Sequence, residues 1–294
     1  MVGTLADPVK AAIAGRRMIA NARMYSVTPE VAALWRSLLA AVLEKVDVPI
    51  DIVDHAPPAP ISELWKRPDK AAVFMCGLPW SLATPQPTLV AAPRPSPQAF
   101  GDRACYWTDL VVRANSPFQS LEQTFSHRLA LTTPESQSGY AAALYALMAY
   151  GGDKPLYREI IEPRFTPMGA LSAVIENKAE VAPIDSYALA LLTKYAPELT
   201  AQVRIIKSTE PTAIPAFVAS GQAPAGVAAA FLTAGAEAAP RALMDQLLLH
   251  SFAHPEAAAY DALRERFLIM QAFWRRHPLA EKSHPLFAAE FGGH

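Results

Sequence analysis

Short apolar runs alternate with helical patterns along most of this 294-residue sequence. Near the start, Thr28-Pro29-Glu30 supplies a helix N-cap, a proline suited to the first turn and an acidic residue. The apolar residues that follow recur at helical spacing to about Lys45. Repeated strand–helix–strand order predicts an α/β fold with parallel strands and right-handed crossovers. The predicted strands of this first series are 18–25, 50–54 and 70–76, and its helices are 29–45 and 62–67.

A second series of the same kind follows a long predicted strand at 105–113 and a break at Ser116-Pro117. Two α/β series joined by an extended segment predict two lobes. Residues 18–113 and 211–294 would form lobe one, residues 114–210 lobe two, and residues 1–17 an N-terminal extension. The pattern of 224–294 is mostly helical. The second series has predicted strands at 128–132, 180–184 and 203–207, and predicted helices at 120–125, 138–150, 167–177 and 186–195.

Composition and charge exclude several classes of partner. With 52% hydrophobic and 18% charged residues, the chain can bury a large core. Its formal net charge of −1 gives no general attraction for nucleic acid, and no apolar run approaches the roughly 18 residues of a membrane-spanning helix. The two cysteines form no metal motif, and HSFAH at 250–254 lacks the glutamate of H-E-x-x-H. We expect no metal, no cofactor, no nucleic acid and no membrane insertion.

The stretch TTPESQSGYAAALYAL, residues 132–147, places several small hydrogen-bonding residues at one helix start. The first N–H groups of a helix have no partners within the helix, and the helix dipole adds partial positive charge there. Ser136, Gln137 and Ser138 can add side-chain donors, and Gly139 lets a ligand approach the backbone. The stretch therefore predicts an anion site, with a simple N-cap and a packing glycine as the alternative.

Two segments resemble the phosphate, phosphite and phosphonate binding proteins of ABC importers. One is SPFQSLEQTFSHRLALTTPESQSGYAAALYAL, which is similar to the family's segment that ends in a Ser-x-Ser-Gly-Tyr helix start. The other is GALSAVIENKAEVAPIDSYAL, which is similar to its helix–strand–helix segment. The resemblance implies the type II periplasmic-binding-protein fold, in which two Rossmann-like α/β lobes, joined by two crossover strands, close on a ligand. It also implies a solute-binding role and an importer permease as a partner.

The resemblance also implies site residues. The helix start that grips the anion corresponds to residues 136–138, the acidic residue that opens a lobe-two helix to Asp185, and a polar position on the return crossover to Glu210 and Thr212. The resemblance also places cleft aromatics at the end of the first strand and in a Gly-x-Pro-aromatic loop. In the long strand the adjacent Tyr106 and Trp107 point to opposite faces, so at most one of them lines the cleft. The predicted ligand-binding residues are Tyr25, Trp80, Tyr106, Ser136, Gln137, Ser138, Gly139, Tyr140, Asp185, Glu210 and Thr212.

The ligand and the cellular location stay open at this point. Where phosphonate-binding members often have a histidine, this chain has Thr166, so another small anion or a polar organic molecule is an alternative ligand. The segment MVGTLADPVKAAIAGRRMIANARMY is a poor signal peptide, because Arg16 and Arg17 interrupt its short apolar patch. This leaves both a periplasmic and a cytoplasmic location open.

A cytoplasmic enzyme or ligand sensor on the same fold is the alternative function. The sequence has no G-x-S-x-G, P-loop or G-x-G-x-x-G motif. Candidates for a nucleophile–base–acid triad are scattered, and their spacing does not define a site. They are Ser136 or Ser138, His55 or His127, and Asp54 or Asp185.

Overall fold

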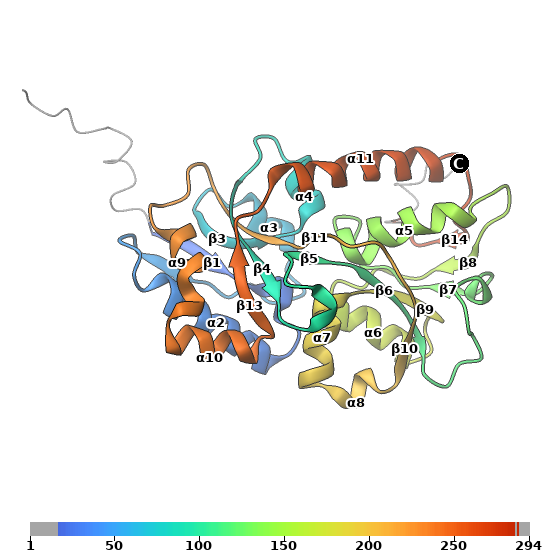
Figure 1. Ribbon diagram of the computed structural model, residues 1–294. Helices are drawn as coiled ribbons and strands as arrows, with labels where there is room; N and C mark the ends of the chain where they lie inside the picture. The colour runs from blue at the N-terminus through green and yellow to red at the C-terminus, as the bar shows by residue number, and fades with distance from the viewer. Residues whose placement is uncertain (1–16, 286, 288–294) are drawn as a thin grey trace, which may run out of the picture.

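The computed structural model describes residues 17–285 and residue 287, and in this part of the chain it contains two six-stranded sheets. The first sheet has the strand order β13-β4-β12-β3-β1-β2, and the second β10-β6-β9-β7-β8-β14. Each sheet is the centre of one lobe, with helices on its faces (Figure 1). The predicted α/β class and the two lobes are confirmed. Residues 1–16 of the predicted extension lie outside the described residues.

Lobe one begins with parallel strands, as the strand–helix–strand pattern predicts. Strand β1 pairs in parallel with β2 and β3, and β12 and β13 add antiparallel pairs. The strands are β1 (Met18–Asn21), β2 (Ile50–Ile52), β3 (Lys70–Met75), β4 (Thr88–Pro95), β12 (Ala216–Ala219) and β13 (Leu249–Ala253). The helices are η1 (Arg23–Tyr25), α2 (Pro29–Leu43), α3 (Ile61–Lys66), α4 (Gly77–Leu82), η2 (Gln98–Phe100), α9 (Val227–Thr233), η6 (Ala234–Ala236) and α10 (Ala238–Gln246).

Lobe two is built around β7, which pairs in parallel with β8 and β9. Strand β6 lies antiparallel to both β9 and β10. The strands are β6 (Thr108–Arg113), β7 (Arg128–Leu129), β8 (Tyr157–Ile160), β9 (Val181–Asp185), β10 (Val203–Ser208) and β14 (Ala280–Ser283). The helices are η3 (Glu122–Thr124), η4 (Gln137–Ala141), α5 (Ala142–Leu147), η5 (Met148–Tyr150), α6 (Pro167–Ile175), α7 (Ser186–Tyr195) and α8 (Pro197–Thr200).

Two extended segments connect the lobes. The chain leaves lobe one through β5 (Cys105–Tyr106) and β6, and it returns through β10 and β11 (Thr212–Ala213). Strands β5 and β11 pair with each other in a small antiparallel sheet. The predicted strand 105–113 is interrupted at Trp107, because its N–H donates to the Ser186 Oγ at 3.0 Å, outside the sheet ladder.

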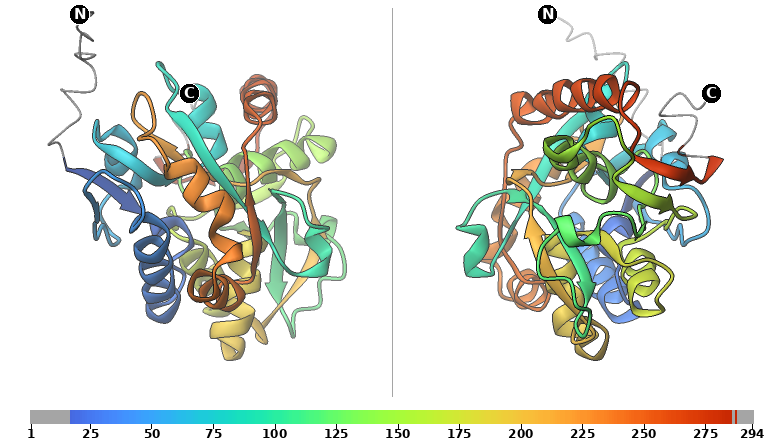
Figure 2. Two further views of the ribbon diagram at one scale, coloured as in Figure 1. Left: turned by 60° about the vertical axis from the view of Figure 1, so that its left-hand side comes forward. Right: turned by 90° about the vertical axis from the view of Figure 1, so that its right-hand side faces the viewer.

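Helix α11 (Ala257–Trp274) is a further connection between the lobes, and it lies along one edge of the molecule (Figures 1 and 2). Its Tyr260 and Leu263 belong to the lobe-one core, whereas its Met270 and Trp274 belong to a lobe-two core. Strand β14 then pairs in parallel with β8. The prediction that 211–294 lies in lobe one is therefore wrong for the C-terminal part. The apolar pattern predicts that one face of this helix is buried, but it does not show which lobe that face contacts.

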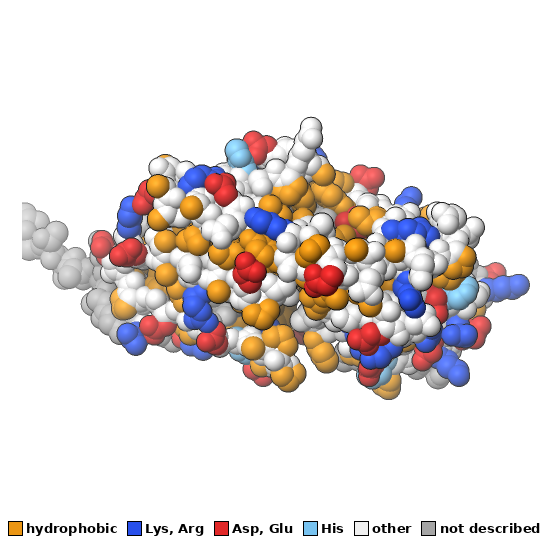
Figure 3. Space-filling model, turned by 90° about the horizontal axis from the view of Figure 1, so that it is seen from below, with side chains coloured by type: hydrophobic (Ala, Val, Ile, Leu, Met, Phe, Trp, Pro, Cys, Tyr) orange, Lys and Arg blue, Asp and Glu red, His pale blue; other side chains and the backbone are white. Residues whose placement is uncertain are grey.

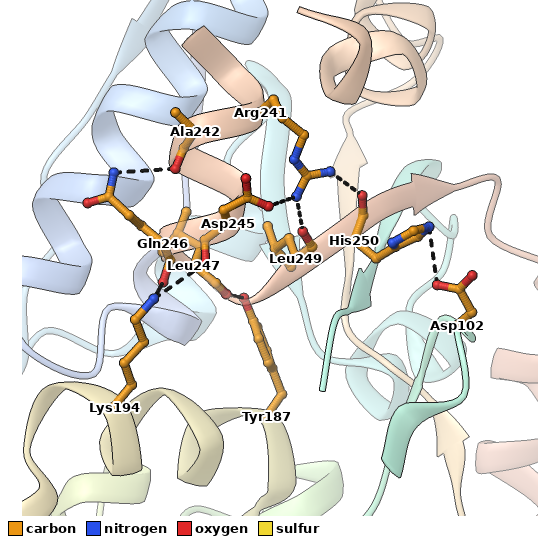
Figure 4. Close-up of polar contacts among 10 residues, drawn as sticks. All are labelled: Asp102, Tyr187, Lys194, Arg241, Ala242, Asp245, Gln246, Leu247, Leu249 and His250. Carbon is orange, nitrogen blue, oxygen red and sulfur yellow. Dashed lines mark hydrogen bonds and ion pairs between the residues drawn. The ribbon is translucent and has the colours of Figure 1, made fainter. Parts of the chain in front are cut away.

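Residues 224–294 are less helical than predicted, because β13 and β14 lie within them. His250 is on β13, so His250 and His254 do not share a helix face. The His250 Nε2 lies 3.3 Å from an Asp102 oxygen instead (Figure 4). Across the described residues, no group of three or more His, Cys, Asp and Glu side chains is placed to hold a metal. The helices in that part of the chain are also too short or too polar to cross a membrane.

Side chains of α7 contact the C-terminal end of α10, at the edge of the molecule opposite α11 (Figures 1 and 4). The Lys194 Nζ donates to the Gln246 carbonyl at 2.8 Å, and the Tyr195 hydroxyl donates to the same oxygen at 2.8 Å. The Tyr187 hydroxyl donates to the Leu247 carbonyl at 2.6 Å. Donors from lobe two thus satisfy the partly negative end of a lobe-one helix. Seen from this side, the surface mixes acidic, basic and hydrophobic side chains (Figure 3).

Candidate functional site

A cavity of about 470 Å³ lies between the lobes. Lobe one contributes residues that follow the C-terminal ends of β1 and β2, together with the start of α2. Lobe two contributes the segment after β7, the start of η4, the start of α6 and the end of β9. Ligands of open α/β sheets bind in such crevices at the carboxyl ends of strands. The cavity is therefore the candidate ligand site.

Four helix starts face this cavity, and their N-cap residues line it. The caps are Thr28 for α2, Ser136 for η4, Thr166 for α6 and Asp185 for α7. Each cap accepts backbone N–H bonds from its own helix, at 3.2 Å from Val31, 2.9 Å from Gly139, 3.0 Å from Gly169, and 2.9 Å from both Tyr187 and Ala188. Because helix starts carry partial positive charge, their convergence creates an environment that favours an anion.

The predicted anion grip, residues 136–138, and the neighbouring predicted residues Gly139 and Tyr140 are only partly at the cavity. Ser136, Ser138 and Gly139 line it, whereas Gln137 and Tyr140 are buried behind it. The Gln137 N–H donates across the lobes to the Cys76 Sγ at 3.2 Å, and the Tyr140 ring stacks on Phe287. The difference arises because the helix begins with a π turn over Gln137–Ala141, which alters the directions that regular helical spacing predicts.

Gly139 is needed for packing within lobe two, between the start of η4 and Thr132. A Cβ at this position would lie 2.2 Å from the Thr132 Oγ1 and 2.6 Å from its Cγ2. The two residues are also joined by a hydrogen bond from the Thr132 N–H to the Gly139 carbonyl, at 3.0 Å. The glycine therefore allows Thr132, which also lines the cavity, to approach the helix start.

Tyr25 was expected to face the cleft from the end of the first strand, but its ring points into the core and is 1% exposed. The strand stops early, at Asn21, because the Asn21 Oδ1 accepts the Arg23 N–H at 2.8 Å and starts a turn. The neighbours Arg23, Met24 and Ser26 line the cavity instead. Tyr25 still reaches the site indirectly, since its hydroxyl donates to the Asp185 Oδ2 at 3.3 Å.

Four other predicted residues do not line the cavity. The Trp80 indole N–H donates to the Pro87 carbonyl at 2.8 Å, and its ring packs on Tyr260 of α11. Tyr106 is buried in β5, where Thr212 of β11 is its pairing partner, and Glu210 is exposed just before that strand. Strands β5 and β11 hold Tyr106 and Thr212 beside the crossover rather than in the cleft.

The triad candidates are not assembled. A His55 ring nitrogen lies 2.8 Å from the Pro60 carbonyl, and a His127 ring nitrogen lies 2.9 Å from the Phe125 carbonyl. The Ser138 Oγ donates directly to the Asp185 Oδ2 at 3.5 Å, with no histidine between them. This arrangement does not give the serine the histidine base of a triad.

Asp185 is the buried carboxyl group of the site. Burial raises the pKa of Asp185 to about 7, against the lowering effect of the N–H bonds from Ala188 and Tyr187. Because the folded pKa is above the ordinary value near 4, the folded protein binds more protons than the unfolded chain between about pH 4 and pH 7. The stability that depends on Asp185 therefore falls as the pH rises through this window.

The variant Asp185→Asn tests this ionisation. Asparagine keeps an oxygen that can cap α7 but cannot ionise. We expect the free energy of unfolding of the variant, relative to the unmodified protein, to rise by roughly 1–2 kcal/mol between pH 5 and pH 8. Urea unfolding at each pH measures it. A difference that does not change with pH would contradict the ionisation of a buried carboxyl group here.

Several residues at the cavity were not predicted from the sequence to be site residues. They include Thr28, Thr132 and Thr166, together with Arg23. A usable signal was present, because Thr28-Pro29 and Thr166-Pro167 repeat the same N-cap and first-turn proline. Helix starts that follow strands in two lobes are expected to meet at the cleft. The sequence gives no such signal for Arg23, because the predicted strand 18–25 contains no sign of the turn at Asn21.

Comparison with known proteins agrees with this architecture. Residues 26–260 match the family described as "ABC transporter, phosphonate, periplasmic substrate-binding protein". The binding protein of an ABC phosphonate transporter from Pseudomonas aeruginosa has 14% identity and a TM-score of 0.74, with 88% of each chain covered. PhnD1 from Prochlorococcus marinus, solved with methylphosphonate, has 14% identity and a TM-score of 0.70, with 85% of this chain and 96% of that one covered.

A Xanthomonas citri protein solved with ATP has 18% identity and a TM-score of 0.59, covering 87% of this chain and 98% of that one. At such identities the structural likeness establishes the fold, which is that of type II periplasmic binding proteins. No curated protein sequence matches the chain.

Proposed function

This chain belongs to the periplasmic substrate-binding proteins of phosphonate ABC transporters, and from this premise we propose that its lobes close on an organic phosphonate held at the four helix starts. The observation that carries the proposal is the convergence of the caps Thr28, Ser136, Thr166 and Asp185 on one cavity. The starts come from both lobes, so the ligand would bridge them. Binding of this kind needs no covalent chemistry.

Hydroxyl groups supply the donors for the anion. The oxygens of Thr28, Ser136 and Thr166 accept helix N–H bonds, and each hydroxyl hydrogen is left to point at a ligand oxygen. The Thr132 Oγ1 is buried at the cavity and has no hydrogen-bond partner in the described structure. A buried polar atom without a partner is costly, and a ligand oxygen would satisfy it.

Charge at the site fits a phosphonate that retains one proton. Arg23 lines the cavity and supplies positive charge, whereas Arg36, which also lines it, is paired with Asp54. Asp185 adds a carboxyl group that holds a proton near neutral pH. A single proton shared between this carboxyl group and a phosphonate oxygen would remove the repulsion between two anions. The Ser138 hydroxyl, which donates to Asp185, would then be free to donate to the ligand.

The expected partner is the permease of an importer. Family membership implies delivery of a bound solute to such a permease. The two lobes, once closed on a ligand, would present the surface that the permease recognises. Purified permease reconstituted in proteoliposomes, with ATP hydrolysis measured with and without this protein and methylphosphonate, would test this partnership.

The variant Ser138→Ala tests the proposed site. We expect it to weaken methylphosphonate binding about tenfold, because it removes one hydrogen bond to a charged group. Its effect on stability should be small, since the Ser138 side chain caps no helix and its bond to Asp185 is long, at 3.5 Å. Isothermal titration calorimetry measures the affinity, and Ser37→Ala on the exposed face of α2 is the control. Unchanged affinity in Ser138→Ala would place the ligand elsewhere.

A further inference from the structure

The cavity is larger than the smallest phosphonates require. Methylphosphonate has five non-hydrogen atoms, and at about 30 Å³ for each water-sized group it would fill roughly 150 Å³. The cavity measures about 470 Å³, which lies in the range of about 300–1,000 Å³ for sites that hold larger organic ligands. Most of the cavity would thus remain beside a methylphosphonate ion at the helix starts.

The lobe-one wall of the cavity carries a set of apolar side chains, beside the polar residues Asn21, Arg36, Asp54 and His55. We call the apolar set the apolar annex. Its members come from η1, α2, β2 and α3, and apart from Trp35 each is only partly buried although it is apolar. They are Met24, Ala32, Trp35, Ile52, Val53 and Ile61. Apolar surface that is left partly exposed inside a cleft gains by contact with an apolar ligand group.

The annex is continuous with the anion end of the cavity along α2. Thr28 caps this helix, and Ala32, Trp35 and Arg36 follow at the spacing of one helix face. At 1.5 Å per residue, the cavity follows α2 for about 12 Å from Thr28 to Arg36. A ligand with its anion at the Thr28 end would therefore extend its organic group over Ala32 towards Trp35.

Trp35 is the most deeply buried member of the annex. Its ring is 1% exposed and packs edge-on against Phe74 in the lobe-one core. Its indole N–H is buried and has no hydrogen-bond partner in the part of the chain that is described. An aromatic ring accepts an N–H group weakly on its face, while it also contributes a large apolar area.

We infer that the ligand is an arylalkyl phosphonate, whose aromatic group occupies the apolar annex while its phosphonate occupies the helix starts. This inference rests on the proposed function and narrows it to one substrate class. The apolar group supplies affinity through burial, and the helix starts supply the recognition of charge. Short phosphonates would bind at the same helix starts without using the annex.

The test compares benzylphosphonate with methylphosphonate by calorimetry on the unmodified protein. We expect benzylphosphonate to bind about tenfold tighter, because burial of an aromatic ring favours the complex. Equal affinities, or binding of methylphosphonate alone, would overturn the inference and leave the proposed function intact. If neither compound binds, the proposed function fails and the inference fails with it.

Two variants separate the annex from the rest of the site. Ala32→Leu fills the annex from a helix position that tolerates leucine, and we expect it to remove the tenfold preference for benzylphosphonate. Ala33→Leu, on the exposed side of the same helix turn, is the matched control and should keep the preference. An undiminished preference in Ala32→Leu would contradict the placement of the ring.

Discussion

Methylphosphonate binding should fall roughly a hundredfold or more in the variant Gly139→Ala, since several hydrogen bonds to a charged ligand are lost together. The added Cβ would lie 2.2 Å from the Thr132 Oγ1, 2.6 Å from its Cγ2 and 2.9 Å from its Cβ. These atoms cannot easily move away, because the Thr132 N–H is bonded to the Gly139 carbonyl. The helix start must therefore shift, and Ser136 and Ser138 move with it.

The same substitution should lower the free energy of unfolding by about 1–3 kcal/mol, the usual cost of overpacking. Urea unfolding measures this loss, and calorimetry of the folded variant measures the affinity. Gly152→Ala is the control, because a Cβ there would meet nothing within 4 Å. Wild-type affinity in a folded Gly139→Ala protein would show that the ligand does not depend on this helix start.

Trp274→Ala should lower the free energy of unfolding by about 3–5 kcal/mol. Trp274 is 2% exposed at the end of α11, and its indole N–H donates to the Leu144 carbonyl of α5 at 3.0 Å. Its ring also lies against Gly151, where a Cβ would be 3.2 Å from it. Truncation leaves a cavity and removes a hydrogen bond where α11 meets lobe two.

Leu268→Ala is the matched control on the same helix, since Leu268 is 52% exposed, and it should change stability by less than about 0.5 kcal/mol. Chemical denaturation of the three proteins gives the comparison. A loss in Trp274→Ala no larger than that in the control would mean that α11 is not anchored to lobe two.

Local signals predicted helices accurately. The predicted helix 186–195 coincides with α7, and Asp185, expected from the resemblance to open this helix, is its N-cap. The Thr28-Pro29 pair likewise marks the start of α2. Such signals work because a cap and the first turn interact within a few residues of each other.

Irregular turns and tertiary attachments could not be read in this way. The turn at Asn21 ended the first strand four residues before the predicted end, which moved Tyr25 from the cleft to the core. The π turn at Gln137–Ala141 took Gln137 out of the cavity. The attachment of α11 and β14 to lobe two depends on tertiary packing, which a helical pattern in the sequence does not reveal.

The same distinction holds for the site. Ser136, Ser138, Gly139 and Asp185 were predicted, and all four line the cavity. Their place at helix and strand ends made them recognisable. The positions of the aromatic residues were harder to predict, because a strand pattern shows that side chains alternate between two faces but not which face meets the cleft. Trp35, which the helical pattern marks as a core residue, is both core and cavity wall.

The contact between α7 and α10 bears on how fast a bound ligand is released. Any motion that separates these helices must break the bonds from Lys194, Tyr195 and Tyr187 to the Gln246 and Leu247 carbonyls. None of these groups lines the ligand cavity. If release of a bound molecule requires the lobes to part, its residence time depends on bonds that it does not touch. The lifetime of the complex can then be tuned at this surface independently of the contacts that select the ligand.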